Sequence, residues 1–461
     1  MARIVNQVSW CVAISFAFCY FCLPHLTVAL AQSETAVPSQ CDLTTCIQLA
    51  LSHHPDLQAG DSRRLAAQSR VELEKAQWKP QLEFRAEGGY LNGRSVSPFA
   101  LLSGVTEEGL RQESVSGVYY LGSVGLNVPV VKEGKLFGLN SPSLQGARFA
   151  LAAEESLQLS RRDQIIYQVI ASFVNVVKAL EMMKSQGQIV QLAESQHRLA
   201  LSQFKQDLIS RNDLLTSEVQ AGTAQRDLLV LKNALDRSRG DLARAIGLES
   251  PRMMEIRDTP LPPPPAASMP PIEELLTFAY EHRPEIQAQQ AQIGTREQEV
   301  RRLRGERFPT LEVISEYSLG DALDSRSSSQ WRTMAQLSGP LFDFGRNQQK
   351  INISRALATE EARKMERLRG AIAGEVQDVY THLTNARTLL ELTDKQIEQA
   401  TEALKLSRAK SEQQLLPESS AATAYIALLK LEQTKVLATY DLILGYSQLE
   451  LVTGGWKART P

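Results

Sequence analysis

Apolar residues recur at helical spacing along most of the chain, and two segments keep this spacing for longer than a globular domain requires. In the first, residues 146–205, Ile166, Val169 and Phe173 belong to a three-four alternation typical of a coiled-coil seam. The second segment is residues 346–410. A helix rises ~1.5 Å per residue, so ~60 residues extend about 90 Å. The pattern therefore predicts two very long helices packed along their length.

Four shorter segments change to strict alternation of apolar and polar side chains. They lie near residues 82–87, 120–130, 311–319 and 331–341. In the first, Leu82, Phe84 and Ala86 face one way, and the charged residues between them face the other. The alternation predicts two hairpins, with strands within about residues 81–130 and 310–343. Each hairpin has one apolar and one polar face.

The chain contains one structural unit twice. Ala50-Leu-Ser-His-His-Pro-Asp-Leu-Gln-Ala59 returns as Ala279-Tyr-Glu-His-Arg-Pro-Glu-Ile-Gln-Ala288 after 229 residues, with five of ten positions identical. The motif contains Pro55 in the first copy and Pro284 in the second. Another proline follows each of them 25 residues later, at Pro80 and Pro309. Two prolines in matched phase are not expected from helical composition alone. The chain is therefore a tandem duplication.

Shorter helices flank the hairpins and the long helices in both copies. They are expected at about 43–77, 213–247, 272–305 and 418–454. Proline ends the first helix of each copy because it cannot continue a helix, and glycine closes the last one. Two short helices together match one long helix in length, so we expect them to stack end to end beside it.

The amino terminus is typical of an exported protein. Arg3 precedes an apolar stretch, and Ala29-Leu30-Ala31 is a cleavage site of small residues. The expected organisation is a signal peptide at 1–31, a first repeat at 32–258, a proline-rich crossover at 259–271, a second repeat at 272–456 and a tail at 457–461.

The remaining composition narrows the possible functions. The formal charge of −2 gives no reason to expect nucleic acid as a partner, and no stretch after residue 31 has the uninterrupted apolar length of a transmembrane helix. The mature chain keeps Cys41 and Cys46. In an oxidising compartment they could form a small-loop disulfide. The alternative is two unpaired thiols, because one turn of intact helix would hold them poorly for bonding.

The sequence offers no catalytic or cofactor site. No histidine lies with cysteines or carboxylates at metal-ligand spacing. A phosphate-binding loop, a dinucleotide fingerprint and a nucleophile elbow are also lacking. We therefore expect neither an enzyme nor a bound metal or cofactor.

Four amphipathic strands cannot close a barrel, and an open sheet edge is not tolerated in lipid. Strands from other copies must therefore complete the barrel. Two copies would give eight strands around a filled interior, whereas three would give twelve around an aqueous lumen. Charged residues on the polar faces favour three copies and are the expected lumen residues: Glu83, Arg85, Glu87, Glu312, Glu316 and Arg332.

Several motifs resemble the TolC-type outer membrane efflux family, in the right order and in both repeats. They are Leu49-Ala-Leu-Ser-His-His-Pro-Asp-Leu57, Trp78-Lys-Pro-Gln-Leu82, the segment 204–215, Leu242-Ala-Arg-Ala-Ile-Gly-Leu248 and Gly339-Pro-Leu-Phe-Asp-Phe-Gly345. The resemblance implies a mainly α fold with β-strands, in which a homotrimer forms a twelve-stranded outer-membrane barrel continued by a helical tunnel across the periplasm. It also implies docking to a periplasmic adaptor and an inner-membrane transporter.

The turns between the long and returning helices depart from the family pattern, which usually has glycine there. Asp207 occupies that place in the first turn and tolerates left-handed backbone better than most residues. The residues expected at the adaptor-docking tip are Phe204, Asp207, Leu208, Ser210, Leu415, Pro417 and Glu418. Asp213 and Glu418 are candidates for a charged constriction at the closed end.

Three interpretations of function follow. The first is a passive exit duct of a tripartite efflux pump. The second is a protein-secretion duct of the same family, of the type I kind. The third is a soluble periplasmic coiled-coil scaffold without membrane insertion.

Overall fold

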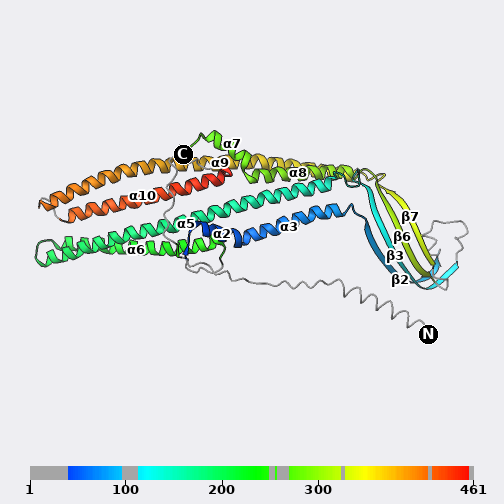
Figure 1. Ribbon diagram of the computed structural model, residues 1–461, viewed down its shortest axis with the longest axis horizontal. Coiled ribbons are helices and arrows are strands. Elements are labelled where there is room, and N and C mark those ends of the chain that lie inside the picture. Colours follow the sequence, from blue (N-terminus) through cyan, green and yellow to red (C-terminus); the bar gives the residue numbers. More distant parts are fainter. Residues whose placement is uncertain are drawn as a thin grey trace, which may run out of the picture. The chain divides into compact units, whose positions relative to one another are not determined.

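The helices and strands occur in the same order twice (Figure 1). In the first copy they are α2 (Leu43–His53), α3 (Pro55–Ala76), β2 (Gln81–Ser95), β3 (Glu113–Lys132), α5 (Pro142–Lys205) and α6 (Arg211–Ile246). In the second they are α7 (Ile272–His282), α8 (Pro284–Gly305), β6 (Thr310–Ala322), β7 (Ser328–Ser338), α9 (Arg346–Glu412) and α10 (Glu418–Thr453). The described residues also form three two-residue strands: β1 (Gln40–Cys41), β4 (Lys135–Leu136) and β5 (Glu255–Ile256).

This computed structural model describes residues 40–95, 113–248, 255–256, 269–322, 328–413 and 418–455, all within the unit Gln40–Pro461. The expected signal peptide, the tail and most of the proline-rich crossover lie outside the described residues. The mainly helical fold with two hairpins is confirmed, and the long helices lie where the periodicity predicted them.

The first helix of each copy is broken, and here the prediction of one continuous helix was wrong. His54 and Arg283 have extended backbone, with ψ of 124° and 126°, between α2 and α3 and between α7 and α8. The next residue is Pro55 or Pro284, whose ring disfavours helical backbone at the residue before it. Each proline then starts the second helix, where its missing N–H has no partner to lose.

The last helix of each copy ends against that break. Gly247 follows α6 and Gly454 follows α10, both with left-handed backbone at φ of +88° and +77°. A Cβ on Gly247 would lie 2.9 Å from Pro55 Cδ, and one on Gly454 would lie 3.0 Å from the Arg283 backbone nitrogen. The pairs α3 and α6, and α8 and α10, therefore meet at these breaks while each packs along a long helix (Figure 1). The predicted end-to-end stacking is confirmed.

Helix α5 of the first copy packs against helices of both copies, whereas the cluster around Leu275, Ile372 and Leu383 lies within the second copy. α5 packs against α3 and α6 of its own copy and against α8 and α10 of the other. One described helix, α5, is long and apolar enough by composition to cross a membrane. Its apolar residues Ile165, Val169 and Phe173 are at most 4% exposed, however, because neighbouring helices cover them. The side of α5 that holds these three residues therefore belongs to the helical core.

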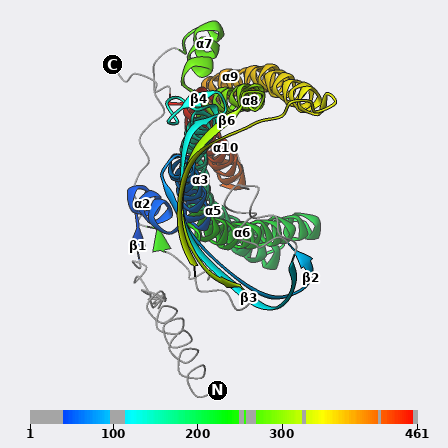
Figure 2. The ribbon, with the colours of Figure 1, turned by 90° about the vertical axis from the view of Figure 1, so that its right-hand side faces the viewer.

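The four long strands form one antiparallel sheet in the order β2-β3-β6-β7, with β4 paired to the end of β3. Figure 2 shows the sheet as a curved layer. β7 ends at Ser338, before the predicted limit at 343, because Pro340 has no N–H to extend the ladder. Within the described residues, β2 and β7 each pair with one neighbour, so both are edges of this sheet.

We predict that Gly247→Ala destabilises the protein by about 1–2 kcal/mol, since alanine is strained in left-handed backbone and its Cβ would press on Pro55. Thermal melting followed by helical circular dichroism measures the loss. Gly240→Ala is the matched control, since a Cβ there meets nothing within 4 Å. It should stabilise by roughly 0.5–1 kcal/mol. Equal melting temperatures for the two variants would contradict the packing at the break.

Candidate functional site

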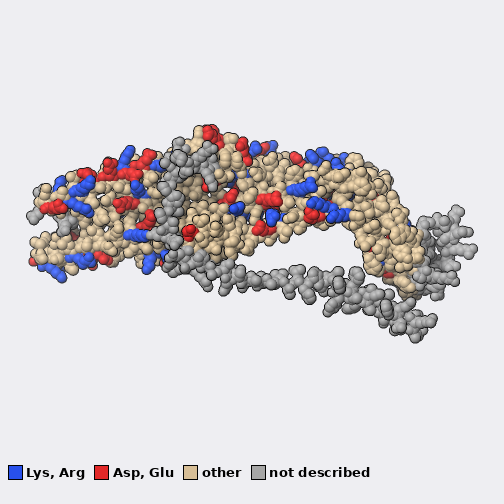
Figure 3. Space-filling model, viewed as in Figure 1, with Lys and Arg blue, Asp and Glu red and all other residues tan. Residues whose placement is uncertain are grey.

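One face of the sheet is apolar and open to solvent in the isolated chain. Phe84 is 75% exposed and Trp331 is 71% exposed. The register places large apolar residues from all four strands on this face: Leu82, Phe84, Tyr120, Val124, Leu126, Tyr317, Leu319, Trp331 and Leu337. Charged side chains are nearly absent from the visible surface of the sheet, whereas they cover the helices (Figure 3). Such a face is suited to hydrocarbon rather than water.

The opposite face carries all six residues expected in the lumen. Arg332 lies directly across from Glu316, and its Nη2 is 2.7 Å from Glu316 Oε2. Asn127 donates a hydrogen bond from Nδ2 to Glu312 Oε2 at 3.2 Å. The remaining three, Glu83, Arg85 and Glu87, alternate along β2 on the same face and are exposed. The structure thus brings the six together on one surface.

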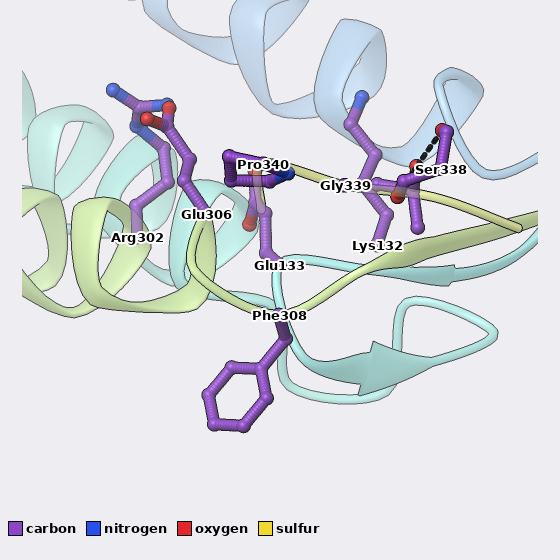
Figure 4. Close-up of a pocket in the computed structure, with 9 residues that line it drawn as sticks. Lys132, Glu133, Arg302, Glu306, Phe308, Ser338, Gly339 and Pro340 are labelled. Atoms are coloured by element: carbon purple, nitrogen blue, oxygen red, sulfur yellow. Dashed lines mark hydrogen bonds and ion pairs between the residues drawn. The ribbon is translucent and has the colours of Figure 1, made fainter. Parts of the chain in front are cut away.

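A pocket lies where the sheet meets the helices (Figure 4). Arg302 of α8 points beside Glu306 there, with 2.5 Å between Nη1 and Oε1, and also binds Glu299 at 2.7 Å. Glu306 in turn accepts from Asn347 Nδ2 of α9 at 3.4 Å. These contacts join the end of α8 to the start of α9. Sequence analysis missed this network, although the spacing Glu299, Arg302, Glu306 is that of side-chain pairs on one helix face.

Close backbone approaches fix the same junction. A Cβ on Gly305 would lie 2.4 Å from the Glu133 carbonyl oxygen, and one on Gly339 would lie 3.0 Å from Pro309 Cα. Glu133 itself has left-handed backbone, with φ of +56°, in the turn between β3 and β4. The strands therefore leave the helices through tightly packed chain segments rather than through long connections.

The turn that connects α5 to α6, with the residues beside it, contains four of the expected tip residues. Asp207 has left-handed backbone with φ of +53°, a conformation that glycine adopts most readily. Its N–H donates to the Phe204 carbonyl at 3.0 Å, and the Leu208 N–H donates to the Gln203 carbonyl at 3.0 Å. Leu208 is 68% exposed. This bonding closes α5 with the carbonyl pattern of a glycine-terminated helix.

Ser210 and Asp213 form a capping box at the start of α6. Ser210 Oγ accepts from the Asp213 N–H at 3.2 Å and donates to Asp213 Oδ2 at 2.7 Å. The Ser210 N–H donates to the same carboxylate oxygen at 3.1 Å. The hydroxyl and backbone hydrogen bonds from Ser210 lower the pKa of Asp213. The carboxylate considered for a constriction therefore holds its own helix end.

In the second turn, Leu415 and Pro417 lie outside the described residues. Glu418 begins α10, and its side chain also lies outside them. Further along the helices, more than ten residues from either turn, Val190 of α5, Ala221 of α6 and Leu429 of α10 share a buried cluster. At the end of the helical part opposite the sheet lie the last residues of α5 and α9 and the first residues of α6 and α10 (Figure 1). Residues from both copies therefore pack together along the helices, before the turns are reached.

Comparison with known proteins identifies the class. The model of the family described as outer membrane efflux protein matches residues 46–248 and 275–455. The chain therefore belongs to the outer membrane efflux protein family, and the expected TolC-type resemblance is confirmed. Its location is the outer membrane, with the helical part extending into the periplasm. Family membership supports an efflux duct in general terms and argues against a soluble scaffold.

Individual relatives are distant in sequence and similar in fold. Protein CyaE of Bordetella pertussis is 23% identical over 356 residues, which cover 75% of this chain and 69% of CyaE. The outer membrane protein VceC of Vibrio cholerae has a TM-score of 0.72 at 17% identity, covering 90% of this chain and 96% of VceC. The open state of the MtrE outer membrane channel of Neisseria gonorrhoeae has a TM-score of 0.69 at 16% identity, covering 90% and 89%. MtrE is described as a channel and the family as an efflux protein family, neither as an enzyme.

We predict that Asp213→Asn destabilises the α5–α6 turn at neutral pH and loses this effect in acid. The folded pKa of Asp213 lies below its unfolded value of about 3.9. Its stabilisation is therefore present above that value and disappears as pH falls through the folded pKa. Hydrogen exchange of the turn amides, measured in both proteins between neutral and strongly acid pH, reports the difference.

Ser210→Ala provides the control for this prediction. It removes one partner of the carboxylate, so the effect of Asp213→Asn should shrink in that background. A difference between wild type and Asp213→Asn that stayed constant down to strongly acid pH would count against the capping box.

Proposed function

We infer that this protein is the outer-membrane exit duct of a tripartite efflux pump. One observation carries the proposal: a sheet with an apolar face, a charged face and two open edges, attached to helices that hold both turns at their far end. The charged face is suited to an aqueous passage and the apolar face to lipid. The duct itself performs no chemistry and binds no cofactor, and the inner-membrane partner supplies the energy.

Three copies complete the duct. Twelve strands pair the open edges of β2 and β7 with neighbouring copies and leave an aqueous lumen. The helices give a second, independent reason for assembly. Leu229 and Val230 of α6 are 59% and 60% exposed, and Leu389 and Leu392 of α9 are 49% and 53% exposed. Contacts with neighbouring copies would remove these apolar side chains from water.

The proposed trimer also defines the lining of the passage and the tip on which an adaptor docks. Threefold repetition turns each carboxylate of the polar face into a ring that favours cations in the passage; the lining residues are Glu83, Arg85, Glu87, Glu312, Glu316 and Arg332. A periplasmic adaptor docks on the turns, which contain Phe204, Asp207, Leu208, Ser210, Leu415, Pro417 and Glu418. Asp213 and Glu418 remain the candidates for the constriction. The two repeats, 32–258 and 272–456, each supply one hairpin and one turn.

The molar mass of the protein, extracted in detergent from the outer-membrane fraction, tests the assembly. Light scattering corrected for bound detergent should give three protomer masses. A monomer in the soluble periplasmic fraction would overturn both the trimer and the membrane location.

Efflux is tested in the host that carries the protein. Deleting the chain should raise cellular accumulation of a fluorescent efflux dye, and restoring it should reverse the effect. If accumulation is unchanged while the set of secreted proteins changes, the chain serves protein secretion instead.

Two adjacent residues of β7 distinguish the lipid face from the lumen face. Ala335 lies opposite Val313 on the apolar face, and Gln336 lies opposite Glu312 on the charged face. Arginine facing lipid near the bilayer midplane costs about 2–4 kcal/mol. Ala335→Arg should therefore sharply reduce the folded protein recovered from outer membranes, whereas Gln336→Arg should leave recovery near wild type. Equal recovery of the two variants would mean that the faces are assigned wrongly.

A further inference from the structure

Cys41 and Cys46 lie in contact at the start of the described chain. Their exposed fractions are 1% and 0%, and their side chains share a hydrogen bond. Asp42, between them in sequence, is the N-cap of α2 and accepts from the Thr45 N–H at 2.9 Å. Cys41 therefore precedes the cap, and Cys46 occupies the fourth helical position. Side chains at these two positions pack together across a helix start, as in the hydrophobic staple.

This geometry removes the objection raised by sequence alone. Two cysteines within one turn of intact helix would be held poorly for bonding, but Cys41 is outside the helix, in strand β1. Asp42, the N-cap residue, has extended rather than helical backbone, with ψ of 169°. The chain therefore leaves the helical path at Asp42, and the Cys41 side chain lies against that of Cys46.

The second copy shows that packing at this place does not require sulfur. A shift of 229 residues places Pro270 and Leu275 at the positions of Cys41 and Cys46. Leu275 is 0% exposed, like Cys46. The second copy therefore fills the same helix start with apolar side chains, whereas the first has two thiols in contact. What the thiols add is the capacity to form a covalent bond.

We propose that Cys41 and Cys46 form an intramolecular disulfide while the exported chain folds in the periplasm. The oxidant is a protein disulfide of the periplasmic thiol-oxidising class. One cysteine thiolate attacks this disulfide, and the second then displaces the carrier from the mixed disulfide. The chain gains one S–S bond and loses two protons and two electrons, and the carrier leaves as a dithiol.

The bond forms before α2 docks on α5 and α6. Burial raises the pKa of Cys46 to about 12 in the folded protein, which suppresses the thiolate that exchange requires. Once formed, the bond is shielded because external reductants cannot reach its buried sulfur atoms.

The disulfide covalently attaches strand β1 to helix α2. β1 pairs in parallel with β5, with Gln40 opposite Glu255 and Cys41 opposite Ile256. Residues 255 and 256 lie after α6, near the end of the first repeat. The bond therefore joins this segment, through β1, to the helical part of the first copy.

Peptide mapping of the outer-membrane protein tests the bond. The protein is quenched in acid, denatured in guanidinium with N-ethylmaleimide and digested with trypsin. Between residues 32 and 62 there is no lysine or arginine, so both cysteines fall in the peptide that ends at Arg63. This peptide should be two hydrogens lighter than the dithiol form and carry no maleimide. Prior reduction should give two adducts, and two adducts without reduction would overturn the proposal.

Hydrogen exchange tests what the bond does. Reducing the unfolded protein and refolding it under reducing conditions should speed exchange of the β1 and α2 amides by about tenfold or more. The control is Cys41→Ala/Cys46→Leu, which keeps an apolar helix start as in the second copy. Its exchange should not respond to reductant. Unchanged exchange in reduced wild type would show that the bond does not hold this segment.

Discussion

The backbone groups along the outer edges of β2 and β7 are the constraint on which the architecture depends. Hydrocarbon offers no water to satisfy an unpaired N–H or C=O, so a sheet edge cannot lie open in a membrane. β2 has 15 residues and β7 has 11, and a tilted strand needs roughly 9–11 residues to cross. Both edges are thus long enough to lie at membrane depth. The side-chain alternation adds a second requirement, because the charged face needs water where the apolar face needs lipid.

The helical part also has groups that a single chain leaves uncovered, in this case apolar side chains. Each long helix packs against shorter helices of its own copy and, in the case of α5, also against α8 and α10. The layer remains too thin to cover every apolar side chain, as the exposed Leu229 and Leu392 show. Closing the sheet edges and covering these leucines call for the same solution, which is further copies of the chain around one axis. Two parts with different secondary structure therefore favour the same assembly.

Periodicity predicted the large elements because each depends on many residues in a regular pattern. Pro80 and Pro309 mark the change of period, and β2 and β6 begin at Gln81 and Thr310, directly after them. The turn at Asp207 could also be anticipated, since few residues other than glycine accept its left-handed backbone.

Features that depend on single residues or on distant contacts could not be predicted in this way. The break at His54 was missed because Pro55 lies inside a continuous apolar pattern, which masks the local effect of the proline on the residue before it. The pairing of β1 with β5 joins two-residue strands more than 200 residues apart, too short for any periodic signal. The six residues of the charged face were assigned correctly to one face because their alternation is local. Their partners across the sheet, such as Arg332 with Glu316, required the register.

The two copies share the same backbone geometry at the helix break and differ in the side chains that stabilise the break. At the first break, His54 Nδ1 accepts from the Asp56 N–H at 3.2 Å. At the second, Arg283 is 7% exposed and binds Glu375 at 2.6 Å. Proline and glycine thus determine where the helices break and meet, because they act through backbone geometry alone.

The side chains around these points are then free to diverge, since each copy contacts different neighbours. Arg283 reaches Glu375 of α9 and Glu285 of α8, and Glu285 accepts from Ser160 Oγ of α5 at 2.7 Å. The second break therefore links both copies, whereas the first is capped within its own. A duplicated chain can in this way keep one architecture in both halves while the contacts between the halves become specific to each.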